Sequence, residues 1–365
     1  MLPASLLMLL LALPAGSDPG RVEAHTNWSV DYSGFRRIAP GDELVVLAQS
    51  DGVYGNDAAT GVSRWARRDL GEGFGVPTVD AARVYVGAAK GADSAVTTEQ
   101  ATHALDRTTG ETRWRSPFWA YEGVAAASER VVGIGAMSSG GKLAVVALRS
   151  NDGEVAWSST LDGLWKTAPR PQAAGELVLC RTQQGIVALR VADGAVAWRS
   201  AANESWADFG VHGEVTVVLG ADDRRGRARG LRTADGATLW TAQLSAPSTG
   251  LAFVADDALV STWDGEVVRL DLAKGGERWR TKLAAGSSAD PLVVSEILLV
   301  RRDERAAGSK SARVWSALEL ANGTVRGDAL EVEDKDTLVA DARGRLWWSR
   351  PNLGKLCSLE LRRVP

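Results

Sequence analysis

The chain has 365 residues, which is enough for one large domain or two ordinary ones. Its hydrophobic fraction of 45% is ordinary for a soluble globular protein, and its formal net charge of −3 gives no support to a nucleic-acid-binding role. The aromatic residues are unusual, because 14 Trp stand against 5 Phe and 4 Tyr, and this bias predicts a tryptophan that is fixed in a repeating unit.

Residues 1–17 have the pattern of a secretory signal peptide. An apolar run from Leu6 to Leu13 is too short to span a bilayer, and Ala15-Gly16-Ser17 offers a cleavage site of small residues. No Lys or Arg precedes the run, which departs from the usual signal-peptide pattern. No Cys stands directly after the run, so no bacterial lipid anchor is predicted at that site. The pattern predicts a periplasmic or secreted protein, with an apolar tail on a cytoplasmic protein as the alternative. No later segment is long and apolar enough to be predicted as a transmembrane segment.

One spacing recurs along the chain: an apolar residue, a Gly five positions later, and a Trp four positions after the Gly. Six copies keep the Gly-to-Trp spacing, and they end at Trp65, Trp114, Trp157, Trp198, Trp240 and Trp279. In the first copy Asn56 takes the place of the apolar residue, and in a seventh copy Gly327 takes the place of the Trp. The glycines recur about every forty to fifty residues, which is the spacing of a repeat protein.

Each repeat has the pattern of four short strands. Apolar runs such as 145–148 and 267–270 are typical of strands, and Asp-Gly, Thr-Gly or Asn-Gly pairs follow them. These pairs supply the positive φ that a tight hairpin turn requires. A second turn, often Asp-Gly as at 51–52 and 264–265, lies upstream. Four strands with a period near forty predict an all-β fold of four-stranded antiparallel propeller blades.

The two ends of the chain are predicted to complete one blade together. The last unit, residues 355–361, has the strand but ends before the Gly and the Trp, whereas Trp28 stands alone near the N-terminus. Pairing an N-terminal strand with the C-terminal blade removes exposed strand edges. Seven Gly-containing units and this composite unit predict an eight-bladed β-propeller over residues 25–365, with seven blades as the alternative.

The recurring tryptophan is predicted to seal the seams between blades. An indole offers a large flat apolar surface with a single N–H to satisfy, and neighbouring blades must bury each other's faces. The predicted interblade residues are Trp28, Trp65, Trp114, Trp157, Trp198, Trp240 and Trp279.

The segment from Thr262 to Trp279 resembles the pyrroloquinoline-quinone (PQQ) repeat, whose core reads Ala-x-Asp-x-x-Thr-Gly-x-x-x-Trp. The family with this repeat contains quinoprotein dehydrogenases, which hold PQQ and calcium in a central channel, and non-enzymatic propellers such as the BamB-like propellers of outer-membrane protein assembly. Adjacent cysteines, which mark the dehydrogenases, do not occur in this sequence.

The resemblance therefore implies a monomeric, non-catalytic propeller without a cofactor, which binds a protein partner in the cell envelope. A PQQ-dependent dehydrogenase or sugar-binding propeller is the first alternative, and a purely structural cell-surface propeller is the second.

No catalytic, cofactor-binding or metal-binding residue is predicted. Cys180 and Cys357 lie far apart and share no motif, so we expect two buried or semi-buried free thiols. With only His25, His103 and His212 in the sequence, zinc sites and histidine catalysis have few candidates.

Aromatic residues outside the repeat are predicted to gather on one face of the ring. The turn between the second and third strands of a blade and the crossover to the next blade lie on the same face. The predicted interaction face combines crossover aromatics with nearby arginines, and its residues are Phe74, Trp119, Tyr121, Trp165, Trp206, Phe209, Arg224, Arg225, Arg301 and Arg302. Trp and Arg are often energetically dominant at protein interfaces. The alternatives are aromatics that fill the mouth of the channel and arginines that are merely solvated.

Overall fold

The computed structural model describes residues 20–31, 35–90, 99–137, 141–166, 168–200, 208–222, 225–283, 288–304, 312–333, 336–341 and 343–364. Nearly all of the regular structure is β-strand. The helical elements in these residues are two single turns, η1 (Arg68–Leu70) and η2 (Pro351–Leu353). None of the helices in the described residues is long and apolar enough to cross a membrane.

The described strands form six separate four-stranded sheets and one eight-stranded sheet. Five of the four-stranded sheets are formed by consecutive strands. The first contains β2 (Phe35–Pro40), β3 (Leu44–Gln49), β4 (Gly52–Asp57) and β5 (Ser63–Arg67). The second contains β14 (Gln172–Ala174), β15 (Leu177–Thr182), β16 (Gly185–Arg190) and β17 (Val196–Arg199). The third contains β18 (Asp208–His212), β19 (Val215–Asp222), β20 (Arg225–Arg232) and β21 (Thr238–Leu244). The fourth contains β22 (Ser248–Val254), β23 (Asp257–Thr262), β24 (Glu266–Asp271) and β25 (Glu277–Lys282). The fifth contains β26 (Ser288–Val294), β27 (Ile297–Glu304), β28 (Ala312–Glu319) and β29 (Val325–Val332).

The eight-stranded sheet consists of two antiparallel four-stranded units. One unit contains β6 (Glu72–Val79), β7 (Arg83–Lys90), β8 (Glu99–Asp106) and β9 (Thr112–Ser116). The other contains β10 (Trp119–Ala127), β11 (Arg130–Ala136), β12 (Ala144–Arg149) and β13 (Val155–Ser159). The units meet at one parallel pair, Val76 with Gly123. Glycine permits this approach, because a Cβ on Gly75 would lie 2.8 Å from the backbone nitrogen of Gly123. The sheets therefore number seven, one of them double, instead of the eight separate blades predicted.

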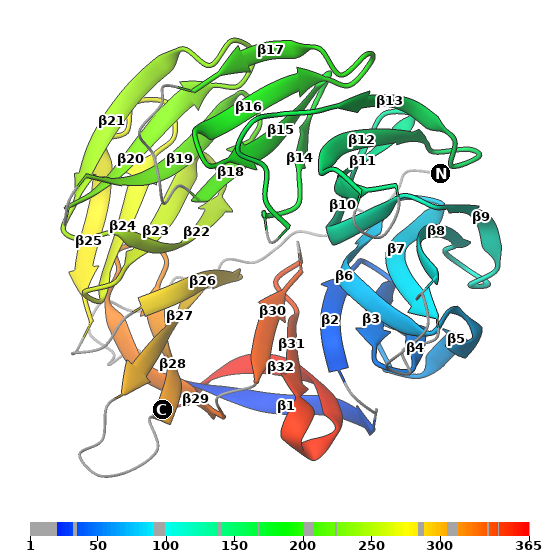
Figure 1. The fold of residues 1–365 in the computed structure, drawn as a ribbon. Coiled ribbons are helices and arrows are strands. Elements are labelled where there is room, and N and C mark those ends of the chain that lie inside the picture. The colour runs from blue at the N-terminus through cyan, green and yellow to red at the C-terminus, as the bar shows by residue number, and fades with distance from the viewer. Residues whose placement is uncertain are drawn as a thin grey trace, which may run out of the picture.

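The sheets are arranged in a ring (Figure 1). In every unit built from consecutive strands, the first strand faces the centre and the following strands lie progressively farther out. This arrangement confirms the predicted all-β propeller of four-stranded antiparallel units.

The remaining four-stranded sheet joins the two ends of the chain. It contains β30 (Thr337–Ala340), β31 (Leu346–Arg350), β32 (Lys355–Val364) and β1 (Arg21–Asp31). The strands β1 and β32 are antiparallel along their whole length, from Arg21 opposite Val364 to Asp31 opposite Lys355. The predicted closure by an N-terminal strand is thus confirmed, and we call this sheet the closing sheet.

The core lies between neighbouring sheets. One hydrophobic cluster, for example, combines Val132 and Trp157 of the unit β10–β13 with Val178, Val187 and Leu189 of the sheet β14–β17. All five side chains are at most 9% exposed. Each sheet therefore buries one face against the preceding sheet and the other against the following one, as a propeller requires.

The six repeat tryptophans from Trp65 to Trp279 have equivalent positions at these seams. Each indole N–H donates to a backbone carbonyl of the next unit along the chain, over 2.6–3.0 Å. Each ring packs against the glycine of the next unit's turn, where φ is between 68° and 75° and a Cβ would overlap the indole. A glycine is needed there for both reasons. The six side chains are 6–9% exposed, so each of these six seams contains one buried repeat indole.

The seam between the sheet β26–β29 and the closing sheet lacks this tryptophan, since Gly327 stands in its place. Polar contacts join the two sheets there: Arg21 Nη2 donates to the carbonyl of Asp328 over 3.4 Å, and Arg363 lies 3.1 Å from the carboxylate of Glu319.

Both Cys180 and Cys357 are buried and free, as the sequence predicts.

His103, on β8, is a buried titratable group in the core. Its side chain is 7% exposed, and its Nδ1 has no hydrogen-bond partner in the described part of the chain. Burial lowers the pKa of His103 to about 4, and the positive charges of Arg115 and Arg67 act in the same direction. The folded protein therefore holds this imidazole neutral at pH values where the unfolded chain protonates it.

We expect the free energy of unfolding to fall as the pH decreases from 6.5 to about 4, because in that window the unfolded chain binds a proton that the folded protein does not. The loss from this one group is about 3 kcal/mol at most. Urea denaturation at a series of pH values measures it. His103→Gln should flatten the pH dependence, whereas His212→Gln, at an exposed residue, should not. Equal slopes for the wild type and His103→Gln would contradict the assignment.

Candidate functional site

One face of the ring carries the crossovers between sheets and the turns between second and third strands. Trp119 begins β10 and lies opposite Ala136, the last residue of β11. The crossover before β14 touches the β15–β16 turn, where the N–H of Gln183 donates to the carbonyl of Gly163 over 2.8 Å. The N–H of Trp263, in the β23–β24 turn, donates to the carbonyl of Pro247 in the crossover before β22. We call this surface the crossover face.

Two aromatic rings stand together at the start of β10. The ring centroids of Trp119 and Tyr121 lie 4.9 Å apart with an interplanar angle of 36°. The Nζ of Lys166, from the next crossover, lies 5.7 Å from the centroid of Tyr121. The register of β10 and β11 shifts between Ala120 and Val124, and this bulge lies beside the aromatic pair. Both rings are half-buried, so part of each faces solvent.

A third ring carries a second cation in the adjacent sheet. The Cζ of Arg181, on β15, lies 5.3 Å from the ring centroid of Trp165. Burial lowers the pKa of Arg181, and the negative charge of Asp208 acts in the opposite direction. Trp165 also packs against the core cluster of its seam. We call Trp119, Tyr121, Trp165, Lys166 and Arg181 the aromatic–cation cluster.

Trp263 is the residue that the sequence analysis missed. Its side chain is 68% exposed, the highest value among the large hydrophobic residues that the structure describes as exposed. The turn around it is held by Thr262 Oγ1, which donates to Asp264 Oδ1 over 2.6 Å, and by an ion pair of 2.7 Å between Asp264 and Lys282. The ring is therefore presented to solvent by an ordered turn. The signal was available, because Trp263 lies outside the Gly-to-Trp spacing and within a turn.

Two of the predicted interaction residues belong to the interior. Phe209 is 3% exposed and packs in the cluster that contains Trp198. Arg302 is 7% exposed, and its guanidinium donates to Ser316 Oγ over 2.6 Å and to Asp328 Oδ1 over 2.7 Å. The prediction that they lie on an interaction surface is wrong for both, because the core and an internal ion pair take up their side chains.

The other predicted residues are distributed differently. Arg225 begins β20 and is exposed, and Arg301 on β27 is half-buried. Phe74 lies in β6, but its side chain is outside the described part of the structure, as are Trp206 and Arg224 altogether. The aromatic–cation cluster thus gathers three of the ten predicted residues and adds Lys166 and Arg181.

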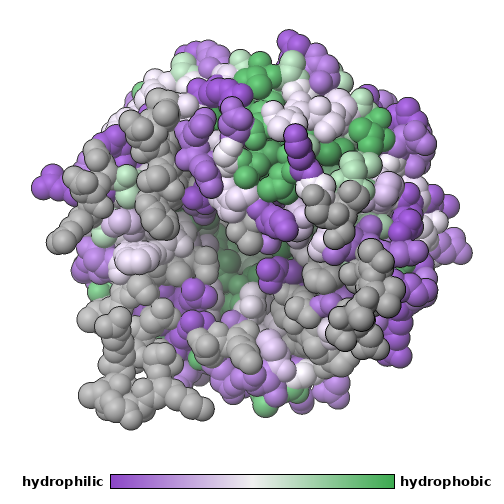
Figure 2. Space-filling model, viewed as in Figure 1, coloured by the Kyte–Doolittle hydropathy of each residue, from purple (hydrophilic) through white to green (hydrophobic). Residues whose placement is uncertain are grey.

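A cavity of about 750 Å³ opens at the central axis. The inner strands β2, β6 and β30 and the turns that follow them line it, so it lies toward the face opposite the crossovers. The guanidinium of Arg170 donates to Thr78 Oγ1 over 3.5 Å there. In Figure 2, hydrophobic residues gather over the sheet β14–β17 and inside the central hollow, among hydrophilic neighbours.

Comparisons with known proteins identify the family. A family model described as outer membrane protein assembly factor BamB matches residues 18–103, 98–254 and 224–358. No curated protein matches the chain. The crystal structure of BamB from Moraxella catarrhalis is 19% identical and has a TM-score of 0.64; the alignment covers 92% of this chain and 97% of that one. The computationally designed protein Ika8 is 14% identical with a TM-score of 0.66, over 94% and 98% of the two chains.

At these identities the solved structures show the fold alone, whereas the family model matches well over half of the sequence. Together with the ring of four-stranded sheets and the recurring Gly-to-Trp seam, it establishes that the chain belongs to the BamB family of PQQ-like repeat propellers.

Proposed function

We propose that this protein is a non-catalytic scaffold that binds protein partners through its crossover face and serves outer-membrane protein assembly in the cell envelope. Membership of a family described as an assembly factor supports the process. The observation that carries the binding role is Trp263, whose side chain is 68% exposed on a turn that hydrogen bonds hold, so the core takes up little of its indole. Trp is among the residues that most often dominate the binding energy of protein interfaces.

The aromatic–cation cluster supplies the second contact surface in this proposal. A cation near an aromatic ring presents N–H donors beside a flat apolar surface, which suits backbone carbonyls and acidic side chains of a partner. A closed ring of sheets holds these groups rigidly, so little conformational entropy is lost on binding. Arg225, exposed at the start of β20, extends the basic character of the same face.

Three further statements belong to the proposal. We count the eight-stranded sheet as two blades fused at one pair of residues, which makes the ring eight-bladed. We regard residues 1–17 as a signal peptide for a periplasmic or secreted protein. We place the start of the propeller at Arg21, where β1 begins, four residues before the bound of 25 predicted from the sequence. We regard the protein as a monomer, because in this proposal the crossover face is reserved for partners of other sequence.

Partner capture from the protein's own cell envelope tests the proposal. We expect a consistent partner to crosslink to the wild type and to Leu239→Ala, which changes a 39% exposed residue on the outer strand β21. Trp263→Ala should lose that partner at least tenfold with unchanged thermal stability. Trp165→Ala should lose it as well. Undiminished capture by Trp263→Ala would contradict the proposal, and a loss of stability in Trp165→Ala without loss of the partner would assign Trp165 to the core alone.

A further inference from the structure

The seam between the closing sheet and the sheet β2–β5 differs from the six seams described above. Trp28, on β1, packs against Gly61 as the other tryptophans pack against their glycines. Its indole N–H, however, has no carbonyl partner among the described residues, and the ring is half-buried instead of 6–9% exposed. The indole instead makes a tilted contact with Trp347, at 5.5 Å between ring centroids. Trp347, which is 0% exposed, is thus the fully buried indole of this seam, and Trp28 covers it from the outer strand.

A polar residue stands in the core of this seam. Asn56 occupies the repeat position that a leucine takes in six later repeats, and each of these leucines is at most 1% exposed: Leu105, Leu148, Leu189, Leu231, Leu270 and Leu318. Asn56 itself is 6% exposed, and its Oδ1 has no hydrogen-bond partner in the part of the chain that the structure describes. An unpaired buried amide costs about 1–3 kcal/mol relative to a paired one, so the fold alone gives no reason for this residue.

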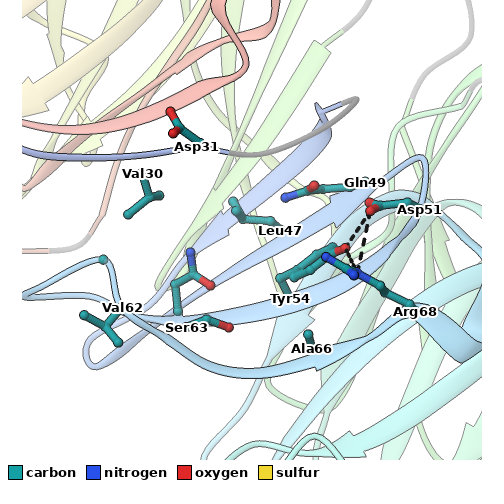
Figure 3. A pocket seen from close by; sticks show the side chains of 12 residues that line it. Val30, Asp31, Leu47, Gln49, Asp51, Tyr54, Val62, Ser63, Ala66 and Arg68 are labelled. Carbon is teal, nitrogen blue, oxygen red and sulfur yellow. Dashed lines mark hydrogen bonds and ion pairs between the residues drawn. The ribbon is translucent and has the colours of Figure 1, made fainter.

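A cavity of about 390 Å³ lies at the same seam. Val30 and Asp31 of β1 form one side of it, and residues of β3, β4 and β5 form the other (Figure 3). Asn56 and Gln49, which is 2% exposed, are among the lining residues. The volume is within the range of small-molecule sites.

The charged groups that line the cavity are two carboxylates, Asp31 and Asp51, and one guanidinium, Arg68. Tyr54 donates its hydroxyl proton to Asp51 Oδ2 over 2.7 Å, and Arg68 Nε donates to the Tyr54 hydroxyl over 2.9 Å (Figure 3). Arg68 and Asp51 also form an ion pair of 3.8 Å. The network uses only Nε of Arg68, whose side chain is 75% exposed. Because Asp31 adds a second carboxylate, the lining carries more negative than positive charge, and this disfavours an anionic ligand.

We infer that this cavity binds a small neutral polyol of the size of one monosaccharide. The carboxamides of Gln49 and Asn56 each offer a donor and an acceptor, which is the pattern that adjacent hydroxyl groups require. Val30, Leu47 and the ring of Tyr54 supply apolar surface for the C–H faces of such a molecule. The site lies between the chain's first strand and its first complete sheet, away from the central axis, and it is independent of the protein partner proposed above.

Calorimetry and ligand-observed NMR on the full propeller test this inference. The neutral probes are glucose and myo-inositol, and the charged probe of similar size is the anion glucuronate. We expect saturable binding of at least one neutral probe and at least tenfold weaker binding of glucuronate, because the lining contains the carboxylates of Asp31 and Asp51. Saturable binding by none of the neutral probes, or tighter binding of glucuronate, would overturn the inference.

Three variants locate the site. Asn56→Leu inserts the residue of the other repeats and should abolish binding while preserving or raising the unfolding temperature. Ala66→Trp, at an exposed lining residue, should block the cavity without altering the core and remains informative if Asn56→Leu fails to fold. Asn151→Leu, at an exposed turn residue of another unit, should bind as the wild type does. Wild-type affinity in folded Ala66→Trp and Asn56→Leu would refute the location. A higher unfolding temperature of Asn56→Leu with no probe bound by the wild type would show a cavity that holds only water.

Discussion

Deletion of residues 20–31 should destabilise the ring by more than any single substitution, by about 5 kcal/mol or more. The deletion removes the whole β1 partner of β32 and the buried Val22, which is 1% exposed. Each lost hydrogen bond contributes about 0.5–1.5 kcal/mol, and each buried aliphatic side chain about 1.5–3 kcal/mol. Because small proteins have only about 5–15 kcal/mol of stability, we expect the shortened chain to populate open or unfolded states at 25 °C. Thermal unfolding followed by circular dichroism, together with the hydrodynamic radius, measures the effect.

The control for this deletion is a chain that begins at residue 20 and keeps β1, which should unfold as the wild type does. A synthetic peptide with the sequence of residues 20–31 should restore part of the lost stability in a saturable manner, since it supplies the missing strand in trans. An unchanged unfolding temperature after removal of residues 20–31 would show that the ring does not depend on its closing strand.

Trp157→Ala should lower the free energy of unfolding by about 3–5 kcal/mol, the usual range for a buried Trp. The indole is 9% exposed, donates to the carbonyl of Val191 over 2.8 Å and packs on Gly194. Trp157→Phe retains most of the apolar contact and loses the hydrogen bond, so a smaller loss, of about 1 kcal/mol beyond the change in volume, is expected. Equilibrium denaturation in guanidinium chloride measures both variants.

Trp263→Ala is the matched control, because the same chemical change at a 68% exposed residue should alter stability by less than about 0.5 kcal/mol. Gly194→Ala tests the seam from the other side. Its φ of 72° is unfavourable for alanine, and the added methyl group would overlap the ring of Trp157. A loss for Trp157→Ala no larger than that for Trp263→Ala would refute the role of the indole in the seam.

The seams could be predicted because their two requirements appear directly in the sequence. A positive φ requires Gly, and a flat buried surface with one hydrogen-bond donor favours Trp. The Gly-to-Trp spacing is therefore the same in six copies, whereas other positions of the repeat vary. The Asp after the apolar residue is one such drifting position. Asp57 accepts turn N–H groups and pairs with Arg64, whereas Arg149 at the equivalent place pairs with Asp152 inside the turn. The same turn can therefore be stabilised by either of two ion pairs. A search for the repeat motif registers only that the Asp has been replaced.

Residues of the interaction face were harder to predict because exposure depends on contacts distant in sequence. Arg302 is held by Asp328, twenty-six residues away on another strand. Phe209 packs in the seam beside Trp198 and not toward solvent. The fusion of two units at Gly75 and Gly123 likewise follows from an approach of two backbones that no repeat period records. The sequence shows that Asn56 departs from the repeat, but only the structure shows that this residue lines a cavity.

The partnership of β1 with β32 also sets the order in which the molecule assembles. Synthesis produces β1 before every other strand described here and β32 after all of them, so the last contact to form joins the segments most distant along the chain. Such non-local pairing is intrinsically slow. Until then β1 remains an unsatisfied edge, and its Arg21, Glu23 and Asp31 place charges along it, a feature that discourages pairing with foreign strands. The native ring is therefore a late product of a complete polypeptide.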